Sequence, residues 1–202
     1  MATTTTNKVT PNTSEAITKE PTYTVPGMTT KEGGSVAQAL QQRLNAYNDL
    51  HLTLKHAHWN VVGPNFMSVH LMLDPQVEAV RGFADAVAER IATLGSSPQG
   101  TPSAIVAQRD WDDYSIGRAG AIEHLGALDQ VYIGVIESTR KVAAEVEESD
   151  PVTNDLLIGH LGELEQFHWF IRAHLENAGG KLATADASSE TDAAAKTARV
   201  TK

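Results

Sequence analysis

The sequence predicts an all-α fold, a bundle of four long helices with a short extra helix in the crossover between helices 2 and 3. Apolar residues recur at steps of three and four over four long segments, which is the spacing of amphipathic helices. Proline or glycine separates these segments, and no strand-like alternation competes with them. A chain of 202 residues with 41% hydrophobic residues is long enough to bury one sizeable core.

The first two helices are expected on either side of a short turn. Ser35 is a suitable N-cap for the first helix, which Gly63 ends. Asn65 can cap the second, which runs to about residue 94 and stops at Gly95. Pro75 lies inside the second helix and should remove one hydrogen bond or bend it.

A long connection follows the second helix. Within it, Thr101-Pro102 resembles a cap with a first-turn proline and predicts a short helix over about 103–108. The third and fourth long helices are expected over about 115–149 and 152–178, with a break at Asp150-Pro151. Four long helices with one long crossover form the architecture called ferritin-like.

Both ends of the chain lack a bulky apolar stripe. Residues 1–34 are rich in Thr, Pro, Gly and Lys and are expected to form a flexible N-terminal arm. Residues 181–202 are expected to form a flexible C-terminal tail. The bundle is therefore assigned to residues 35–180.

Composition excludes several classes of protein. The chain has no cysteine, which excludes disulfides and thiolate metal sites. No apolar run approaches the ~18 residues of a membrane span, and the N-terminus lacks the apolar stretch of a secretory signal. A net charge of −9 repels nucleic acid unless a basic segment overrides it. We therefore expect a cytoplasmic protein, associated with the nucleoid only if such a segment binds DNA.

Two histidines and three carboxylates form the most informative cluster, namely His58, His70, Asp74, Asp85 and Glu89. His70 and Asp74 are four residues apart, as are Asp85 and Glu89, so each pair shares one face of a helix. The two pairs are separated by ~16 Å of helix, whereas metal ligands lie only ~2.0–2.6 Å from their ion. If all five residues serve one site, the second pair must come from another copy of the chain. The spacing then predicts an oligomer with metal at a subunit interface.

Spacing alone leaves other interpretations open. The five residues can also be exposed acids on an amphipathic helix together with two capping or core histidines. If they do bind metal, imidazole and carboxylate suit iron, and the mixed, open set differs from a closed structural zinc site. Metal-assisted hydrolysis of an amide or ester is a further alternative, but the sequence shows no substrate pocket.

The segments HWNVVGPNFMSVHLMLD (58–74) and DAVAERIATLG (85–95) resemble the Dps family, the miniature ferritins named for DNA protection in starved cells. The match spans about residues 35–180. This resemblance implies a hollow dodecamer that oxidises Fe(II), preferentially with hydrogen peroxide, and stores ferric mineral. It also implies that His58, His70 and Asp74 come from one subunit and Asp85 and Glu89 from its two-fold partner, as metal ligands and catalytic residues together.

Further candidate roles each have an alternative. His51, seven residues before His58, is either a hydrogen-bond donor behind a metal ligand or an accessory ligand, or else a core or interface histidine. Trp59 is either core packing or an oxidisable side chain near the iron. The family's acidic pore near the start of the last helix suggests Asp155 and Glu163, although Asp155 also fits a helix-start acid that favours the macrodipole.

Other acids and histidines are expected to lie outside the iron site. Glu165 and His168 form a Glu-x-x-His motif of di-iron proteins, but no second copy occurs, so we expect solvated or interface residues. His56 is expected at the surface, and no ligand role is assigned to the remaining histidines, His124, His160 and His174. A group of acids either lines the mineral cavity or forms a solvated face: Glu145, Glu147, Glu148 and Asp150.

The basic C-terminal end is the candidate contact with DNA. Lys196, Arg199 and Lys202 can contact phosphates, and twelve tails on one particle multiply a weak, salt-sensitive interaction through avidity. The negative charge of the rest of the chain opposes this contact. A nucleoid protein whose main task is to coat DNA is therefore the second hypothesis.

Overall fold

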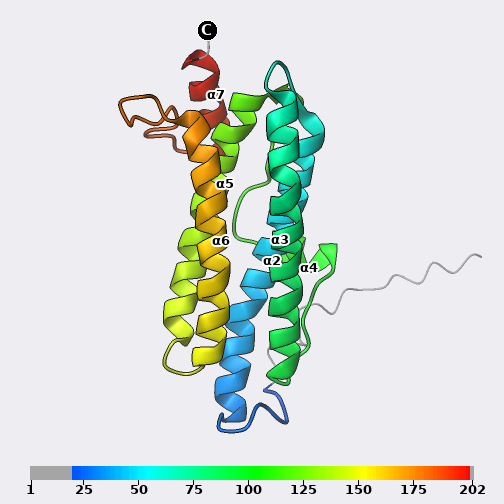
Figure 1. Cartoon of the computed structure of the whole chain (residues 1–202). Coiled ribbons are helices and arrows are strands. Elements are labelled where there is room, and N and C mark those ends of the chain that lie inside the picture. Colours follow the sequence, from blue (N-terminus) through cyan, green and yellow to red (C-terminus); the bar gives the residue numbers. More distant parts are fainter. Residues whose placement is uncertain (1–19, 201–202) are drawn as a thin grey trace, which may run out of the picture.

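A computed structural model describes residues 20–200 of the chain. Four long helices lie side by side as one elongated bundle: α2 (Thr30–Asn60), α3 (Phe66–Thr93), α5 (Ala121–Val146) and α6 (Pro151–Leu175). The short helix α4 (Pro102–Gln108) lies in the connection from α3 to α5, which returns along the bundle (Figure 1). The predicted all-α architecture, with its short extra helix in the crossover, is confirmed. Between residues 20 and 200 no helix is long and apolar enough to cross a membrane.

Two very short strands connect the crossover to the turn between the first two long helices. β1 (Val61–Val62) pairs in parallel with β2 (Ala119–Gly120), with Val61 opposite Ala119. The sequence pattern did not predict these strands, because two residues are too short to show alternation. The pairing holds the start of α5 beside the end of α2, close to the turn that carries His58.

The N-terminal boundary of α2 differs from the prediction. The helix begins at Thr30 rather than after Ser35, because Thr29 and Glu32 form a capping box. The Thr29 hydroxyl accepts from the Glu32 N–H (3.2 Å), and the Glu32 carboxylate accepts from the Thr29 N–H (2.8 Å). Residues 1–19 of the expected N-terminal arm lie outside the described part of the chain.

The other boundaries shift by a few residues. α5 begins at Ala121 instead of about residue 115, where Glu123 accepts from the backbone N–H of Gly120 (2.7 Å). α6 ends at Leu175 instead of about residue 178. Asn65 occupies the predicted N-cap position of α3, but its side chain makes no capping hydrogen bond. These differences leave the helix pairing of the bundle unchanged.

Pro75 lies inside α3 without ending it. Proline removes the hydrogen bond to the carbonyl four residues earlier, which belongs to Leu71. Both Pro75 and Leu71 are exposed, so water can replace the lost partner on this side of the helix. The neighbouring Gln76 is fully buried, and its Oε1 accepts from the Tyr132 hydroxyl at 2.7 Å. This bond joins α3 to α5 across the core.

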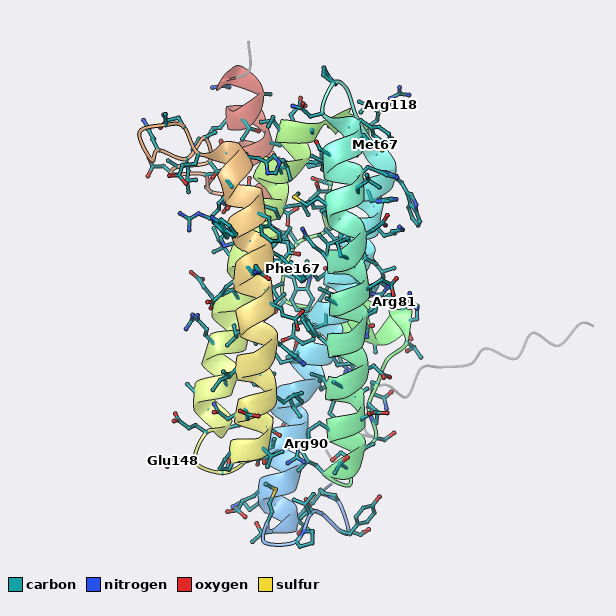
Figure 2. All side chains as sticks on the ribbon, in the orientation of Figure 1. Met67, Arg81, Arg90, Arg118, Glu148 and Phe167 are labelled. Carbon is teal, nitrogen blue, oxygen red and sulfur yellow. The ribbon has the colours of Figure 1, made fainter. Side chains whose placement is uncertain are left out.

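The interior of the bundle is filled by large apolar side chains from all four long helices. Phe167 of α6 points between the helices toward this interior in Figure 2. Leucines supply most of the fully buried volume, among them Leu40, Leu54, Leu73, Leu125 and Leu164. Their spacing in the sequence is the periodicity that predicted the helices.

The C-terminal segment corrects the expectation of a flexible tail. Residues 190–200 form α7 (Glu190–Val200), which packs against α5 with Ala193, Ala194 and Thr197 buried. The segment before α7 is also attached, since the Thr184 hydroxyl donates to buried Asp129 at 2.7 Å. Small residues make this docking surface, so no bulky stripe marks it in the sequence. The last two residues, 201–202, are outside the described part.

A buried ion pair closes the opposite end of the bundle. Arg90, near the end of α3, donates to both carboxylate oxygens of Asp150 at 2.8 and 2.7 Å. Figure 2 shows Arg90 and Glu148 at this end, with Met67 and Arg118 at the other. The suggestion that Asp150 lines a mineral cavity is therefore wrong, because its carboxylate is buried against Arg90. The other acids of that group are exposed: Glu145, Glu147 and Glu148.

Replacing Gly126 by alanine should loosen α7. A Cβ at this position would lie 2.8 Å from Thr197 Cγ2 and 3.0 Å from the carbonyl oxygen of Ala193, both on α7. We expect the overpacking to lower the free energy of unfolding by about 1–3 kcal/mol. Amide hydrogen exchange over residues 190–200 should become faster. Gly134→Ala is the matched control on the same helix, since its Cβ meets nothing within 4 Å. Equal protection of α7 in both variants would contradict this packing.

Candidate metal centre

Three of the five predicted ligands meet in one place. His58 lies in the last turn of α2, and His70 and Asp74 lie on successive turns of α3. The turn at residues 61–65 reverses the chain, so that one ligand-type atom from each of the three residues lies within 4.8 Å of the others. In the part of the chain that the structure describes, no other group of three such residues meets this criterion.

The two histidines hold each other's orientation. Their rings stack with centroids 3.6 Å apart and planes at 24°. His58 Nδ1 lies 3.0 Å from the carbonyl oxygen of His70, and His70 Nδ1 lies 3.0 Å from the carbonyl oxygen of His58. A carbonyl oxygen only accepts, so each Nδ1 must carry the proton. The lone pair of each neutral ring is then on Nε2, which is the arrangement of metal-binding histidines whose other nitrogen donates to a carbonyl.

Asp74 completes the cluster and is half-exposed. Its Oδ1 lies 3.3 Å from His58 Nδ1 and accepts from the Lys55 ammonium at 2.7 Å. The hydrogen bond from Lys55, together with the nearby histidines, lowers the pKa of Asp74. Burial is the main cause that lowers the pKa of His58. The cluster thus presents a charged carboxylate and a neutral imidazole near pH 7, which are the forms that bind a cation.

Asp85 and Glu89 lie further along α3 and are exposed. Figure 2 shows Met67, Arg81 and Arg90 following one another down this helix. In sequence the first ligand pair lies between Met67 and Arg81, and the second between Arg81 and Arg90. Neither acid belongs to the three-residue cluster. His51 likewise lies away from the cluster, in a hollow that Arg81 and Asp85 also line. One chain therefore presents two separate parts of the predicted ligand set.

The structure also places the remaining candidate residues. Trp59 is 70% exposed, so the interpretation as core packing within one chain is wrong. Asp155 and Glu163 are exposed on α6. Lys196 donates to the carbonyl oxygen of Asp186 at 2.6 Å and pairs with Asp192. Arg199 is exposed, and Lys202 lies outside the described residues.

The two residues of the Glu-x-x-His motif each pair with a residue of another helix. Glu165 pairs with Arg140, and His168 Nε2 lies 2.7 Å from Asp129 Oδ1. His168 is mostly buried rather than solvated, because it joins α6 to α5 through Asp129. His56 is likewise half-buried, with Nε2 2.9 Å from the carbonyl oxygen of Ile116.

Two residues near the centre were not identified from the sequence. Lys55 lies one turn before His58 and holds Asp74, and Phe66 packs its ring 4.9 Å from the His70 ring. The spacing of Lys55 to His58 is a signal that could have placed it near the cluster. Its contact with Asp74 depends on how α2 and α3 pack, which local spacing does not determine.

Replacing Lys55 by methionine should increase the affinity of the cluster for divalent cations. Lys55 occupies Asp74 Oδ1 and adds a positive charge beside it, and both effects oppose metal binding. We expect about fivefold tighter binding of Co²⁺ in a calorimetric titration. Lys31→Met, an exposed change at the other end of α2, should leave the affinity unchanged. Weaker binding by Lys55→Met would indicate instead that the ammonium orients Asp74 for the metal.

Comparisons with known proteins identify relatives of this chain. The family model of the ferritin-like domain matches residues 37–179. The DNA protection during starvation protein of Mycolicibacterium smegmatis is 61% identical over 177 residues, covering 88% of this chain and 97% of that protein. The fine tangled pili major subunit of Haemophilus ducreyi is 48% identical over 164 residues, covering 81% of this chain and 87% of that protein.

Solved structures show the same fold. Mycobacterium smegmatis Dps superposes with a TM-score of 0.80 at 62% identity, covering 81% of this chain and 99% of that chain. DpsA14 from Streptomyces coelicolor also gives 0.80, at 63% identity, covering 81% of this chain and 97% of that chain. By sequence, by fold and by the ferritin-like domain within it, this chain belongs to the Dps family of ferritin-like proteins.

Proposed function

We propose that this protein is a ferroxidase and iron store that oxidises Fe(II), preferentially with hydrogen peroxide, and keeps the ferric product in a hollow dodecamer. The observation that carries the proposal is the cluster of His58, His70 and Asp74, which offers nitrogen and oxygen donors at an open position. The donor set suits Fe(II), because imidazole and carboxylate both bind it and an open site admits and releases iron. We expect this activity in the cytoplasm.

The three-residue cluster is half of the proposed site. We propose that Asp85 and Glu89 of a two-fold partner complete it, so that each interface carries two equivalent sites. Several apolar side chains that one chain leaves exposed support burial of this region by a partner, since patches of this kind mark interfaces. They lie on α2 and α3, near the cluster: Leu52, Trp59, Met67 and Leu71.

The chemistry follows from the donors. Fe(II) is the substrate, and two Fe(II) ions supply the two electrons that reduce one hydrogen peroxide to water. Carboxylates stabilise the harder Fe(III) more than Fe(II), so Asp74, Asp85 and Glu89 favour the oxidised product. Two-electron reduction of peroxide leaves less Fe(II) and peroxide to form radicals, which protects DNA without requiring contact with it.

The test is Fe(II) oxidation by hydrogen peroxide, followed by stopped-flow absorbance of the ferric product. His70→Ala/Asp74→Asn should abolish the fast phase, while Glu78→Gln, an exposed carboxylate on α3 outside both ligand pairs, should not. An unchanged rate in the double variant would reject the site. Particle mass in solution tests the dodecamer separately.

Other roles stay predictions. Contact of DNA with Lys196, Arg199 and Lys202 is testable by gel shift at ~50 mM salt, where phosphate contacts are strongest. The contacts of Lys196 with Asp186 and Asp192 place its ammonium within the C-terminal segment. Asp155 and Glu163 are proposed to line an entry pore, where their exposure within one chain suits contact with passing cations.

A further inference from the structure

A pocket of about 420 Å³ lies on the side of the bundle away from the metal cluster. Its walls come from α2, α5, the connection at residues 110–114 and the first residue of α7. The middle is apolar, with Ala46 and Leu50 facing Val131 and Val135. The volume is in the range of pockets for small organic ligands. None of the residues proposed for iron oxidation lines it.

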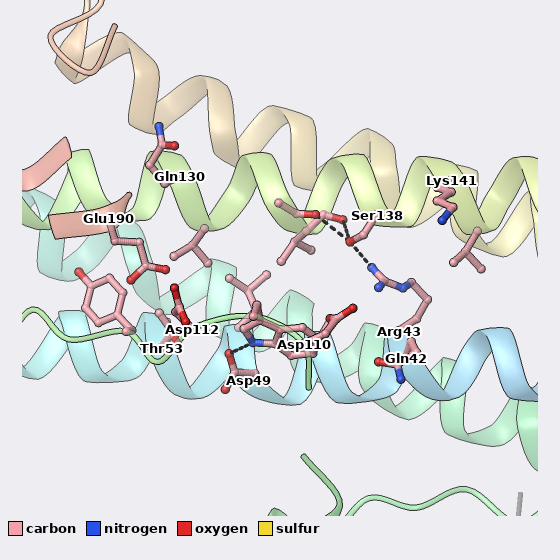
Figure 3. Close-up of a pocket in the computed structure, with 18 of the residues that line it drawn as sticks. Gln42, Arg43, Asp49, Thr53, Asp110, Asp112, Gln130, Ser138, Lys141 and Glu190 are labelled. Atoms are coloured by element: carbon pink, nitrogen blue, oxygen red, sulfur yellow. Dashed lines mark hydrogen bonds between the residues drawn. The ribbon is translucent and has the colours of Figure 1, made fainter. Parts of the chain in front are cut away.

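One end of this pocket is acidic. Asp49 of α2, Asp112 of the connection and Glu190 of α7 converge there, and Figure 3 shows Glu190 and Asp112 at the same end. Burial, with the charges of Asp49 and Asp112, raises the pKa of Glu190 to about 7. Asp49 accepts from the Trp111 indole at 2.8 Å and lies 3.9 Å from Arg109, whereas the described residues provide no hydrogen-bond donor to Glu190. A cation at this end would relieve the repulsion among the three carboxylates.

The other end carries a buried cation. Arg43 is 5% exposed, and its guanidinium reaches from α2 toward Ser138 of α5 in Figure 3. Nη1 donates only to the hydroxyls of Ser138 (2.6 Å) and Thr139 (3.2 Å), and Nε has no hydrogen-bond partner. No carboxylate in the described part of the chain lies within 4 Å of Arg43. Asp110 and Glu145 also line the pocket and act on Arg43 electrostatically, but neither forms an ion pair with it. Because a buried charge without a close partner is costly, this end is suited to an anion that reaches the guanidinium.

The occupant that satisfies both ends is an organic molecule rather than a metal ion. The acids at this pocket do not form a metal-ligand cluster, since the described residues contain only the one at His58. Arg43 and Asp49 are six residues apart on α2, which corresponds to about 9 Å along the helix. An extended tripeptide spans about 10 Å between its ends. Its ammonium and carboxylate thus match the two charged ends, with apolar side chains between them.

We propose that this pocket binds a short apolar peptide with both termini charged, its ammonium among Asp49, Asp112 and Glu190 and its carboxylate at Arg43. Lys141, also at the Arg43 end, lies 3.9 Å from Glu145, so the contact with the carboxylate is assigned to Arg43. Glu190 makes α7 part of the pocket, so a bound peptide also holds the C-terminal helix against the bundle. This binding site is independent of iron oxidation.

The test is calorimetric titration of the full-length protein with three forms of Ala-Leu-Ala: with free ends, N-acetylated and C-amidated. Acetylation and amidation should each weaken binding about tenfold, because each removes one charged contact. In Arg43→Met the free and amidated peptides should bind equally, and in Glu190→Gln the free and acetylated peptides should bind equally. Combining a protein variant with a modified peptide in this way follows the logic of a double-mutant cycle. It separates the loss of a direct contact from a general loss of structure.

Two control variants distinguish the loss of a binding contact from misfolding. Arg43→Lys keeps the positive charge and should retain the preference for a free carboxylate. Glu137→Gln, an exposed change on α5 outside the pocket, should bind all three peptides like the wild type. The proposal is overturned if no form binds at about 10 mM, if all forms bind equally to the wild type, or if the pocket variants weaken every form alike.

Discussion

The variant His70→Ala/Asp74→Asn is expected to oxidise Fe(II) with hydrogen peroxide about 100-fold more slowly than the wild type, or slower. The change removes two of the three donors that the structure brings within 4.8 Å. It also removes the imidazole ring that stacks on the His58 ring, with centroids 3.6 Å apart. Stopped-flow absorbance of the ferric product measures the rate.

Complementation between subunits provides the sharper experiment. Asp85→Asn/Glu89→Gln should also lose activity, because both acids are proposed to serve the partner's cluster. When the two defective chains are co-expressed with different tags, random pairing places intact halves together at about a quarter of the sites. Mixed particles should therefore regain about a quarter of the wild-type rate. No recovery in particles that contain both chains would contradict a shared site.

The second large effect concerns stability. Asp150→Ala should lower the free energy of unfolding by about 3–5 kcal/mol, because it leaves the Arg90 guanidinium without its buried partner. The Asp150 side chain is 3% exposed and also accepts from the Thr153 hydroxyl. Urea unfolding measures the loss. Glu148→Ala, an exposed change two residues away, should stay within about 0.5 kcal/mol of the wild type, and equal losses would argue against the ion pair.

The same pair predicts a pH dependence. Burial raises the pKa of Asp150, but hydrogen bonds from Arg90 and Thr153 outweigh it and hold the pKa below its usual 3.8. A lowered pKa in the folded state stabilises the protein above the unfolded value of ~3.9, and this contribution is lost as pH falls through the folded pKa. Urea midpoints between about pH 6 and pH 2 should show the loss for the wild type. The urea midpoint of Arg90→Met/Asp150→Leu should depend less on pH, because this variant has no titratable carboxylate at position 150.

The sequence alone determined the four long helices and which ligand residues share a helix face. Their periodicity is local, so the spacing of Leu40, Leu54 or Leu73 specifies a buried helical face without knowledge of the neighbouring helix. His70 and Asp74 share a face because they are four residues apart. The separation of this pair from Asp85 and Glu89 follows from the rise of a helix, and a proline that leaves α3 continuous does not remove it.

Only the tertiary structure decided which groups meet across helices. The sequence is equally compatible with a solvated Asp150, and only the structure shows that Arg90 packs beside it. Lys55 reaches Asp74 only because α2 and α3 lie together. The C-terminal helix docks through alanine and threonine against Gly126, a close contact of small residues that hydrophobic patterning does not detect. Burial of Arg43 likewise depends on α5. Contacts between distant segments depend on shape and desolvation, which local spacing does not encode.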